Sequence, residues 1–153
     1  MTIFGVGPKI VSPGVIIFGI GIYLQYGLNV SVNYLTQNPA MPAAAGTIML
    51  GIGLYFWISA AKLIVRQYAA GKLITAGVYN RCRNPMYAGF ILFIFPGVSL
   101  IFNNLLLLAP SIVMYAIFRL KVAVEERYLQ EKFGDEFTAY RNRVPGFFPR
   151  FGK

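Results

Sequence analysis

Histidine is absent from this chain of 153 residues, and cysteine occurs once, at Cys82. A single cysteine excludes an intramolecular disulfide, and the lack of histidine removes the most common general base and metal ligand. Zinc sites, most haem sites and Ser-His-Asp triads depend on residue types that this chain lacks or has once. We therefore expect no bound metal, no nucleophilic role for Cys82, and a reaction that depends mainly on positioning and desolvation.

Charged residues are also scarce. They make up 12% of the chain, about half the share found in soluble domains, whereas 57% of the residues are hydrophobic. The 5 acidic residues all lie at or after Glu125. A small proton-coupled transporter needs an ionisable group inside the membrane, so this distribution argues against a four-helix transporter.

Basic residues give the chain a net charge of +9, but their positions argue against a nucleic-acid partner. Apart from Lys9, every charged residue lies at or beyond Lys62, in blocks that flank apolar segments. A soluble nucleic-acid binder needs a folded core separate from its basic face. We interpret the basic residues as determinants of membrane topology and as contacts to anionic lipid headgroups.

Four apolar segments approach or exceed the roughly 20 residues that cross a bilayer as a helix. They predict transmembrane helices at residues 11–30, 43–65, 86–102 and 105–120. Asn103-Asn104 form a polar break, so the last two helices are expected to form a hairpin. The sequence thus predicts an all-α integral membrane protein with one domain, 1–153, a loop at 66–85 and a helical tail at 121–153.

Local signals refine the second half of this scheme. The fourth helix is expected to continue past Arg119 into the charged block and to stop at Gly134. Asp135 is expected to cap a short helix that follows. Pro96 and Pro110 lie inside apolar segments, where we expect kinks.

The first two apolar segments share a glycine repeat. Gly19-Ile-Gly21 and Gly51-Ile-Gly53 each precede an apolar residue and a tyrosine. Neither follows a strand, so they predict close packing between membrane helices rather than a dinucleotide site. The first segment is expected to remain as a helix and not to be cleaved as a signal peptide, because its apolar run is long and its leading charge is sparse.

Topology follows from the positions of lysine and arginine. The loops near 31–42 and 103–104 contain neither residue, whereas the 66–85 loop contains Arg66, Lys72, Arg81 and Arg83. The tail also carries many basic residues. We therefore expect a multi-pass protein with both termini, the 66–85 loop and the tail on the cytoplasmic side.

Two sequence blocks in the C-terminal half form a recognisable pattern. The first reads Gly77-Val-Tyr-Asn-Arg-Cys-Arg-Asn-Pro-Met-Tyr-Ala-Gly89, and the second begins with Glu125-Glu126 and ends with Phe133-Gly134. Tyr140-Arg141 and Val144-Pro145 follow. Over residues 73–149 this order and spacing resemble the integral-membrane methyltransferases of the isoprenylcysteine carboxyl methyltransferase and phospholipid methyltransferase family.

The resemblance implies an S-adenosylmethionine-dependent methyltransferase with a lipophilic or lipidated acceptor that is resident in the membrane. Two acceptor classes remain open: an isoprenylcysteine-type carboxylate, methylated on oxygen, and a phospholipid amine, methylated on nitrogen. An NADPH-dependent reductase of a related membrane fold is a weaker alternative, since the chain has no extra basic cluster suited to a 2′-phosphate.

The resemblance also implies site residues. Arg83 is the best cation for the carboxylate of the cofactor, because its guanidinium can make a bidentate contact. Asn84 replaces a histidine found in many relatives and cannot take up a proton near neutral pH, which puts an acid–base role there in doubt. The residues implied to bind the cofactor are Gly77, Tyr79, Arg83, Asn84, Pro85, Tyr87, Gly89, Glu125, Glu126 and Tyr140, and those implied to be catalytic are Glu126 and Arg141.

Glu125 and Glu126 are adjacent, so on a helix their side chains point about 100° apart. We expect one to bind the ammonium or ribose of the cofactor and the other to pair with an arginine. The alternative is a solvated helix in which Lys121 pairs with Glu125 and Arg127 with Glu131.

Overall fold

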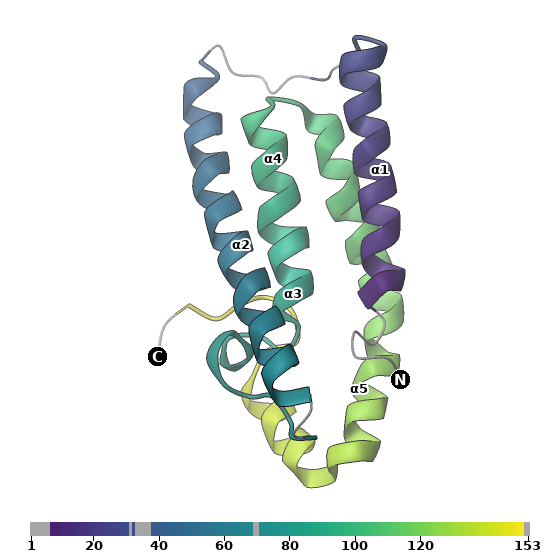
Figure 1. Cartoon of the computed structure of the whole chain (residues 1–153), viewed down its shortest axis with the longest axis vertical. Helices are drawn as coiled ribbons and strands as arrows, with labels where there is room; N and C mark the ends of the chain where they lie inside the picture. Colours follow the sequence, from purple (N-terminus) through teal and green to yellow (C-terminus); the bar gives the residue numbers. More distant parts are fainter. Residues whose placement is uncertain (1–6, 31, 33–37, 69–70, 152–153) are drawn as a thin grey trace.

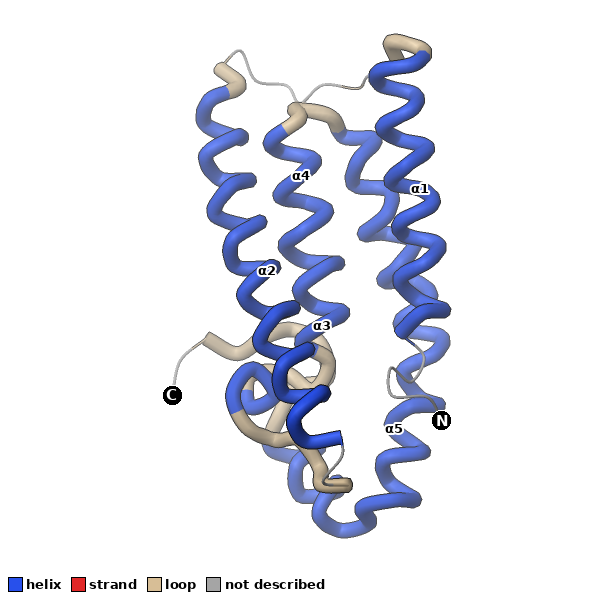
Figure 2. Tube along the Cα trace, viewed as in Figure 1, coloured by secondary structure: helices blue, strands red, loops and turns tan. Residues whose placement is uncertain are grey.

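The computed structural model describes residues 7–30, 32, 38–68 and 71–151, and helices make up its regular structure (Figure 1). Figure 2 shows that the longest helices run along a common direction, with most of the loops near the two ends of the bundle. Their bounds are α1, Gly7–Gly27; α2, Ala40–Tyr68; η1, Gly77–Asn80; α3, Pro85–Ala88; η2, Gly89–Ile94; α4, Phe95–Ile101; η3, Leu105–Leu108; and α5, Ala109–Arg143. The predicted all-helical architecture is confirmed.

Three helical stretches are long and apolar enough to cross a membrane: Lys9–Gly27, Ala40–Gln67 and Leu105–Arg143. The third predicted span, 86–102, corresponds to a shorter apolar helix, Pro85–Ile101, which is built from α3, η2 and α4. The protein is therefore a membrane protein with three candidate spans, and a fourth crossing stays a prediction.

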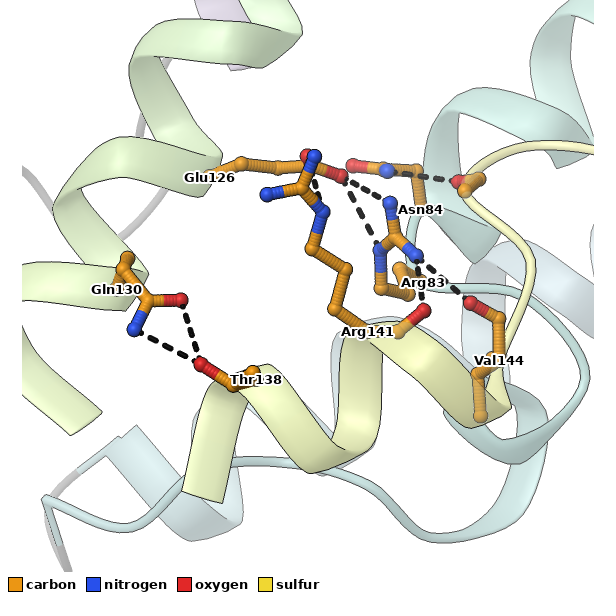
Figure 3. A network of polar contacts seen from close by, with 8 residues as sticks. Arg83, Asn84, Glu126, Gln130, Thr138, Arg141 and Val144 are labelled. Atoms are coloured by element: carbon orange, nitrogen blue, oxygen red, sulfur yellow. Dashed lines mark hydrogen bonds and ion pairs between the residues drawn. The ribbon is translucent and has the colours of Figure 1, made fainter. Parts of the chain in front are cut away.

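The stop predicted at Gly134 is confirmed. Gly134 has φ 51° and ψ −123°, and these values separate α5 into a long helix and a short one. Because φ is positive, a residue with a side chain would be strained there. The Gln130 side-chain amide stabilises the bend by donating to Thr138 Oγ1 at 3.0 Å (Figure 3) and to the Gly134 carbonyl at 3.0 Å. The chain therefore turns back toward the bundle instead of continuing away from it (Figure 1).

The two prolines that were expected to kink helices behave differently. Pro96 is the second residue of α4, just after the π-helical turn Gly89–Ile94, a local widening that accommodates a residue without an amide hydrogen. Pro110 stands in the first turn of α5, where amide hydrogens have no helical partner in any case. The kink expected at Pro110 was therefore wrong, since the proline starts the helix.

Glycine pairs bring α2 and the third apolar helix into close contact. A Cβ built on Gly46 would lie 2.5 Å from the Gly97 carbonyl oxygen, and one built on Gly53 would lie 2.9 Å from the Gly89 carbonyl oxygen. Gly51, in contrast, has no neighbouring atom within 4 Å of such a Cβ. The predicted close packing thus applies to Gly53, whereas Gly51 faces open space.

These positions make a matched pair of substitutions. Gly46→Ala is expected to lower the free energy of unfolding by about 1–3 kcal/mol, because the new methyl group must push two helix backbones apart. Gly51→Ala, on the same helix, is expected to change it by less than about 0.5 kcal/mol. Denaturation in mixed micelles, followed by helical circular dichroism, measures both, and equal losses for the two variants would contradict the close contact.

A buried polar network closes the end of the bundle away from the tail. Asn104 is fully buried, and its side-chain oxygen accepts hydrogen bonds from the Leu106 and Val32 amides. Its amide nitrogen donates to Gln25 Oε1 at 2.9 Å. The polar break in the hairpin therefore ties α1 to the turn between α4 and α5.

Candidate functional site

The residues of the two sequence blocks meet around a cavity at the end of the bundle that carries the tail. The cavity has a volume of about 440 Å³, within the roughly 300–1,000 Å³ range of small-molecule sites. Its walls come from α1, α2, the segment 71–74, η1, residues 83–84, α3, η2 and α5. The predicted site residues that line it are Tyr79, Arg83, Asn84, Pro85, Tyr87, Glu125, Glu126 and Tyr140.

One face of α5 supplies a continuous stripe of this wall. Glu125, Tyr128, Leu129, Lys132 and Phe133 all line the cavity, and their spacing of three, four and seven residues places them on one side of a helix. Trp57 of α2 and Phe90 at the start of η2 form part of the apolar wall. The cavity therefore combines a charged end with a mainly apolar interior.

Glu126 is neutralised by two arginines. Its Oε1 accepts hydrogen bonds from Arg83 Nε, at 3.1 Å, and from Arg83 Nη2. Its Oε2 lies 3.7 Å from Arg141 Nε. Figure 3 shows the two guanidinium groups on either side of the carboxylate. The expectation that one of the two glutamates pairs with an arginine is therefore confirmed, and that glutamate is Glu126.

Arg83 has further partners in the tail. Its Nη1 donates to the carbonyl oxygens of Arg141, at 2.9 Å, and Val144, at 2.7 Å (Figure 3). Its backbone amide donates to the Pro145 carbonyl at 2.9 Å. The protein itself thus occupies most of the guanidinium donors that the sequence analysis assigned to a cofactor carboxylate.

Two neighbouring contacts fasten the same part of the tail. The Asn84 side-chain amide donates to the Gly146 carbonyl at 2.8 Å, and the Tyr140 hydroxyl donates to the Tyr79 carbonyl at 2.6 Å. Asn84 also precedes Pro85, which starts α3. The first sequence block and the tail therefore form one unit that closes the polar end of the cavity.

Glu125 differs from Glu126 in its partners. Tyr87 donates to Glu125 Oε2 at 3.3 Å, and within the parts of the chain that the structure describes no lysine or arginine lies within ion-pair distance of Glu125. The pairing of Lys121 with Glu125 expected of a solvated helix is not observed. Glu125 therefore presents an uncompensated carboxylate to the cavity.

Two lysines that sequence reasoning did not select also line the cavity: Lys72 in the loop after α2 and Lys132 on α5. Lys132 Nζ lies 5.2 Å from the centre of the Phe133 ring. The helical spacing from Glu125 to Lys132 was the available signal, since seven residues make nearly two turns. No sequence pattern predicted that Lys72 lines the cavity, because its position depends on the path of the loop after α2.

Three predicted residues do not line the cavity. Gly77 has φ 61° and begins the 3₁₀ turn η1. Gly89 contacts α2, where a Cβ would lie 3.0 Å from the Gly53 carbonyl oxygen. The Arg141 side chain is 56% exposed and contacts Glu126. Gly77 therefore has a backbone conformation that favours glycine, and Gly89 permits close helix packing. Cofactor binding by these two glycines and a catalytic role for Arg141 stay predictions.

Burial controls the titration of two groups in the 77–84 segment. Burial raises the pKa of the Cys82 thiol to about 12. The pKa of the Tyr79 hydroxyl is also raised, mainly by burial and to a smaller extent by the charge of Glu125. Cys82 therefore stays protonated near neutral pH, where a thiol is a poor nucleophile. This agrees with the expectation that Cys82 has no chemical role.

Comparison with known proteins gives matches to the same part of the chain. The family model described as phospholipid methyltransferase matches residues 40–136. Protein-S-isoprenylcysteine O-methyltransferase B of Arabidopsis thaliana is 32% identical over 85 residues, which cover 56% of this chain and 43% of that protein. Protein-S-isoprenylcysteine O-methyltransferase of Schizosaccharomyces pombe is 35% identical over 77 residues, covering 50% of this chain and 33% of that protein.

A bacterial relative has a wider match. The cobalt-zinc-cadmium resistance protein CzcN of Cupriavidus metallidurans is 32% identical over 107 residues, which cover 67% of this chain and 47% of that protein. The chain thus spans less than half the length of each of these three relatives.

Proposed function

Because the chain belongs to the phospholipid methyltransferase family, we propose that it transfers a methyl group from S-adenosylmethionine to a lipophilic acceptor held in the bilayer. The observation that carries this proposal is the uncompensated Glu125 carboxylate in a cavity with mainly apolar walls. Glu125 is partly buried, and a carboxylate that is partly removed from water and has no cation beside it favours a positively charged ligand. S-adenosylmethionine carries both a sulfonium and an ammonium group.

The residues around the cavity suit this methyl donor. Glu125 would bind its cationic part, while Lys72 and Lys132 are the cations available for its carboxylate. The aromatic side chains of Trp57 and Phe90 offer surfaces for a flat base. We assign Arg83 and Glu126 to the framework of the site, since their charged atoms contact each other and the tail.

When bound, S-adenosylmethionine supplies a methyl group that the positive charge on sulfur already activates toward a nucleophile. The protein then has to orient the two reactants and exclude water. Tyr87 holds the Glu125 carboxylate by donating to Oε2. The apolar wall from α2 and η2 limits access of water to the reacting atoms.

We propose that the acceptor is a carboxylate on a lipidated group, because the plant and yeast relatives are named as O-methyltransferases of protein S-isoprenylcysteine. A carboxylate is ionised near pH 7 and needs no base, which agrees with a chain that lacks histidine. Val11 of α1 and Ile64 of α2 line the cavity and belong to candidate membrane spans, so we propose that the acceptor reaches the cavity from the bilayer. We place both termini and the polar end of the cavity on the cytoplasmic side, where the basic residues are.

Amine N-methylation is a second candidate because of Glu125. An amine has to lose a proton before it attacks, and a carboxylate without a cationic partner can accept that proton. Glu125 would then act as the general base for the amine. The product, an N-methylated amine or a methyl ester, distinguishes the two reactions.

Radiolabelled methyl transfer tests the proposal. Purified protein in detergent is incubated with methyl-labelled S-adenosylmethionine and a membrane lipid extract that includes an S-farnesylcysteine derivative with a free carboxylate. Label that enters the lipid phase and is released by mild alkali indicates a methyl ester, and label that resists alkali indicates N-methylation. If no label enters either acceptor, and titration calorimetry detects no binding of S-adenosylmethionine at millimolar concentration, the proposed function is wrong.

A further inference from the structure

A second hollow lies on a separate part of the surface, along α2. It has a volume of about 510 Å³, and Ile48, Gly51, Ile52 and Tyr55 line it, while Arg81 and Phe151 close one end. None of these residues lines the methyltransferase cavity. Its lining residues on α2 belong to the candidate membrane span Ala40–Gln67, so this part of the groove is expected to contact the acyl chains of the bilayer.

Gly51 is the lining residue of the groove that has no side chain. A Cβ at this position would meet no atom within 4 Å, whereas one at Gly53 would lie 2.9 Å from the Gly89 carbonyl oxygen. Close helix packing therefore explains why position 53 is glycine, but it does not explain why position 51 is glycine. A missing side chain on a lipid-facing helix leaves a notch that a flexible acyl chain can fill.

Arg81 places a positive charge at the end of this apolar groove. Its side chain is exposed and donates from Nη1 to the Arg150 carbonyl at 3.3 Å. No carboxylate among the described residues lies within ion-pair distance of Arg81. Most of its guanidinium donors thus remain available, and a guanidinium matches a phosphate group in geometry and charge.

We propose that this groove binds one anionic phospholipid of the bilayer, with its phosphate at Arg81 and one acyl chain along the notch at Gly51. Juxtamembrane basic residues attract anionic headgroups electrostatically, and the apolar groove distinguishes a lipid from a free phosphate ion. The Arg150 amide donates to the Arg81 carbonyl at 3.0 Å. A bound lipid therefore also steadies the segment that leads from the tail to Phe151. This site is independent of methyl transfer.

Native mass spectrometry of the protein in neutral detergent tests the site. Phosphatidylglycerol and phosphatidylcholine with identical acyl chains are titrated against the wild type and four variants. Arg81→Gln removes the charge, with Arg66→Gln as the control for loss of an exposed arginine nearby in the chain. Gly51→Leu fills the notch, with Gly19→Leu as the control, because a Cβ built on Gly19 also has no atom within 4 Å.

We expect one phosphatidylglycerol to bind the wild type about tenfold more tightly than phosphatidylcholine, and Arg81→Gln to remove that preference. Gly51→Leu is expected to weaken both lipids, and the two control variants to behave as the wild type. Thermal unfolding in the same detergent checks that each variant is folded. Unchanged binding in folded Arg81→Gln protein, or full competition by inorganic phosphate alone, would overturn the proposal.

Discussion

Replacing Glu125 with glutamine is expected to lower methyl transfer about a hundredfold while leaving the protein folded. The substitution keeps the shape of the side chain and the hydrogen bond from Tyr87 but removes the charge that faces the cavity. A charge that is poorly screened by water contributes more to binding and orientation than the same charge on a surface. Initial rates with labelled S-adenosylmethionine and its binding constant from calorimetry measure the two effects separately.

Glu131 supplies the matched control for this experiment. It lies on the same helix, is exposed, and does not line the cavity. Glu131→Gln is therefore expected to change the rate by less than about twofold. If Glu125→Gln retains more than about a third of the wild-type rate, the carboxylate does not face the cationic reactant, and its placement in the proposed site fails.

The sequence was sufficient to predict the helices, because each depends on local patterns. Apolar length predicted the four helical stretches, and the glycine between Phe133 and Asp135 predicted the bend in α5. The kink predicted at Pro110 was wrong because α5 begins at Ala109, later than the apolar segment suggested. The polar break Asn103-Asn104 is followed by one 3₁₀ turn before α5 begins, and hydropathy does not distinguish such a turn from a continuous helix.

The site was predicted less completely, since its contacts join residues far apart in the sequence. The resemblance named Arg83, Asn84 and Glu126 as site residues, and these three residues line one cavity, but the contacts of the Arg83 donors within the protein were not predicted. These donors bind the carbonyl oxygens of Arg141 and Val144, and backbone acceptors at the end of a helix leave no trace in a side-chain pattern. The division of roles between Glu125 and Glu126 likewise depends on which helix face turns toward the first sequence block.

Arg83→Leu is expected to be the most destabilising of the substitutions considered, with a loss of about 3–5 kcal/mol in the free energy of unfolding. Arg83 and Glu126 are largely buried, with side-chain exposures of 13% and 17%. Removing the guanidinium leaves the Glu126 carboxylate with only the Arg141 contact at 3.7 Å. It also removes the donor to two carbonyl groups of the tail.

A double-mutant cycle separates the ion pair from the tail contacts. Glu126→Leu alone leaves Arg83 with its carbonyl partners, so its loss is expected to be smaller than that of Arg83→Leu. In the double variant no buried charge is left unpaired at these positions, and the loss should fall below the sum of the single losses by about 2 kcal/mol. Chemical denaturation in mixed micelles measures all three variants.

Loss of the Arg83 contacts is also expected to loosen the tail locally. Because Arg83 fastens the residues around Val144, Arg83→Leu is expected to expose the tail to trypsin under conditions in which the helical bundle stays intact. Arg127 supplies the control, because it is exposed on α5 and lies outside the observed ion pairs. Arg127→Leu should change the unfolding free energy by less than about 0.5 kcal/mol and leave the cleavage rate of the tail unchanged. Additive single losses would show that Arg83 and Glu126 act independently, and the tail would then be held by the carbonyl contacts alone.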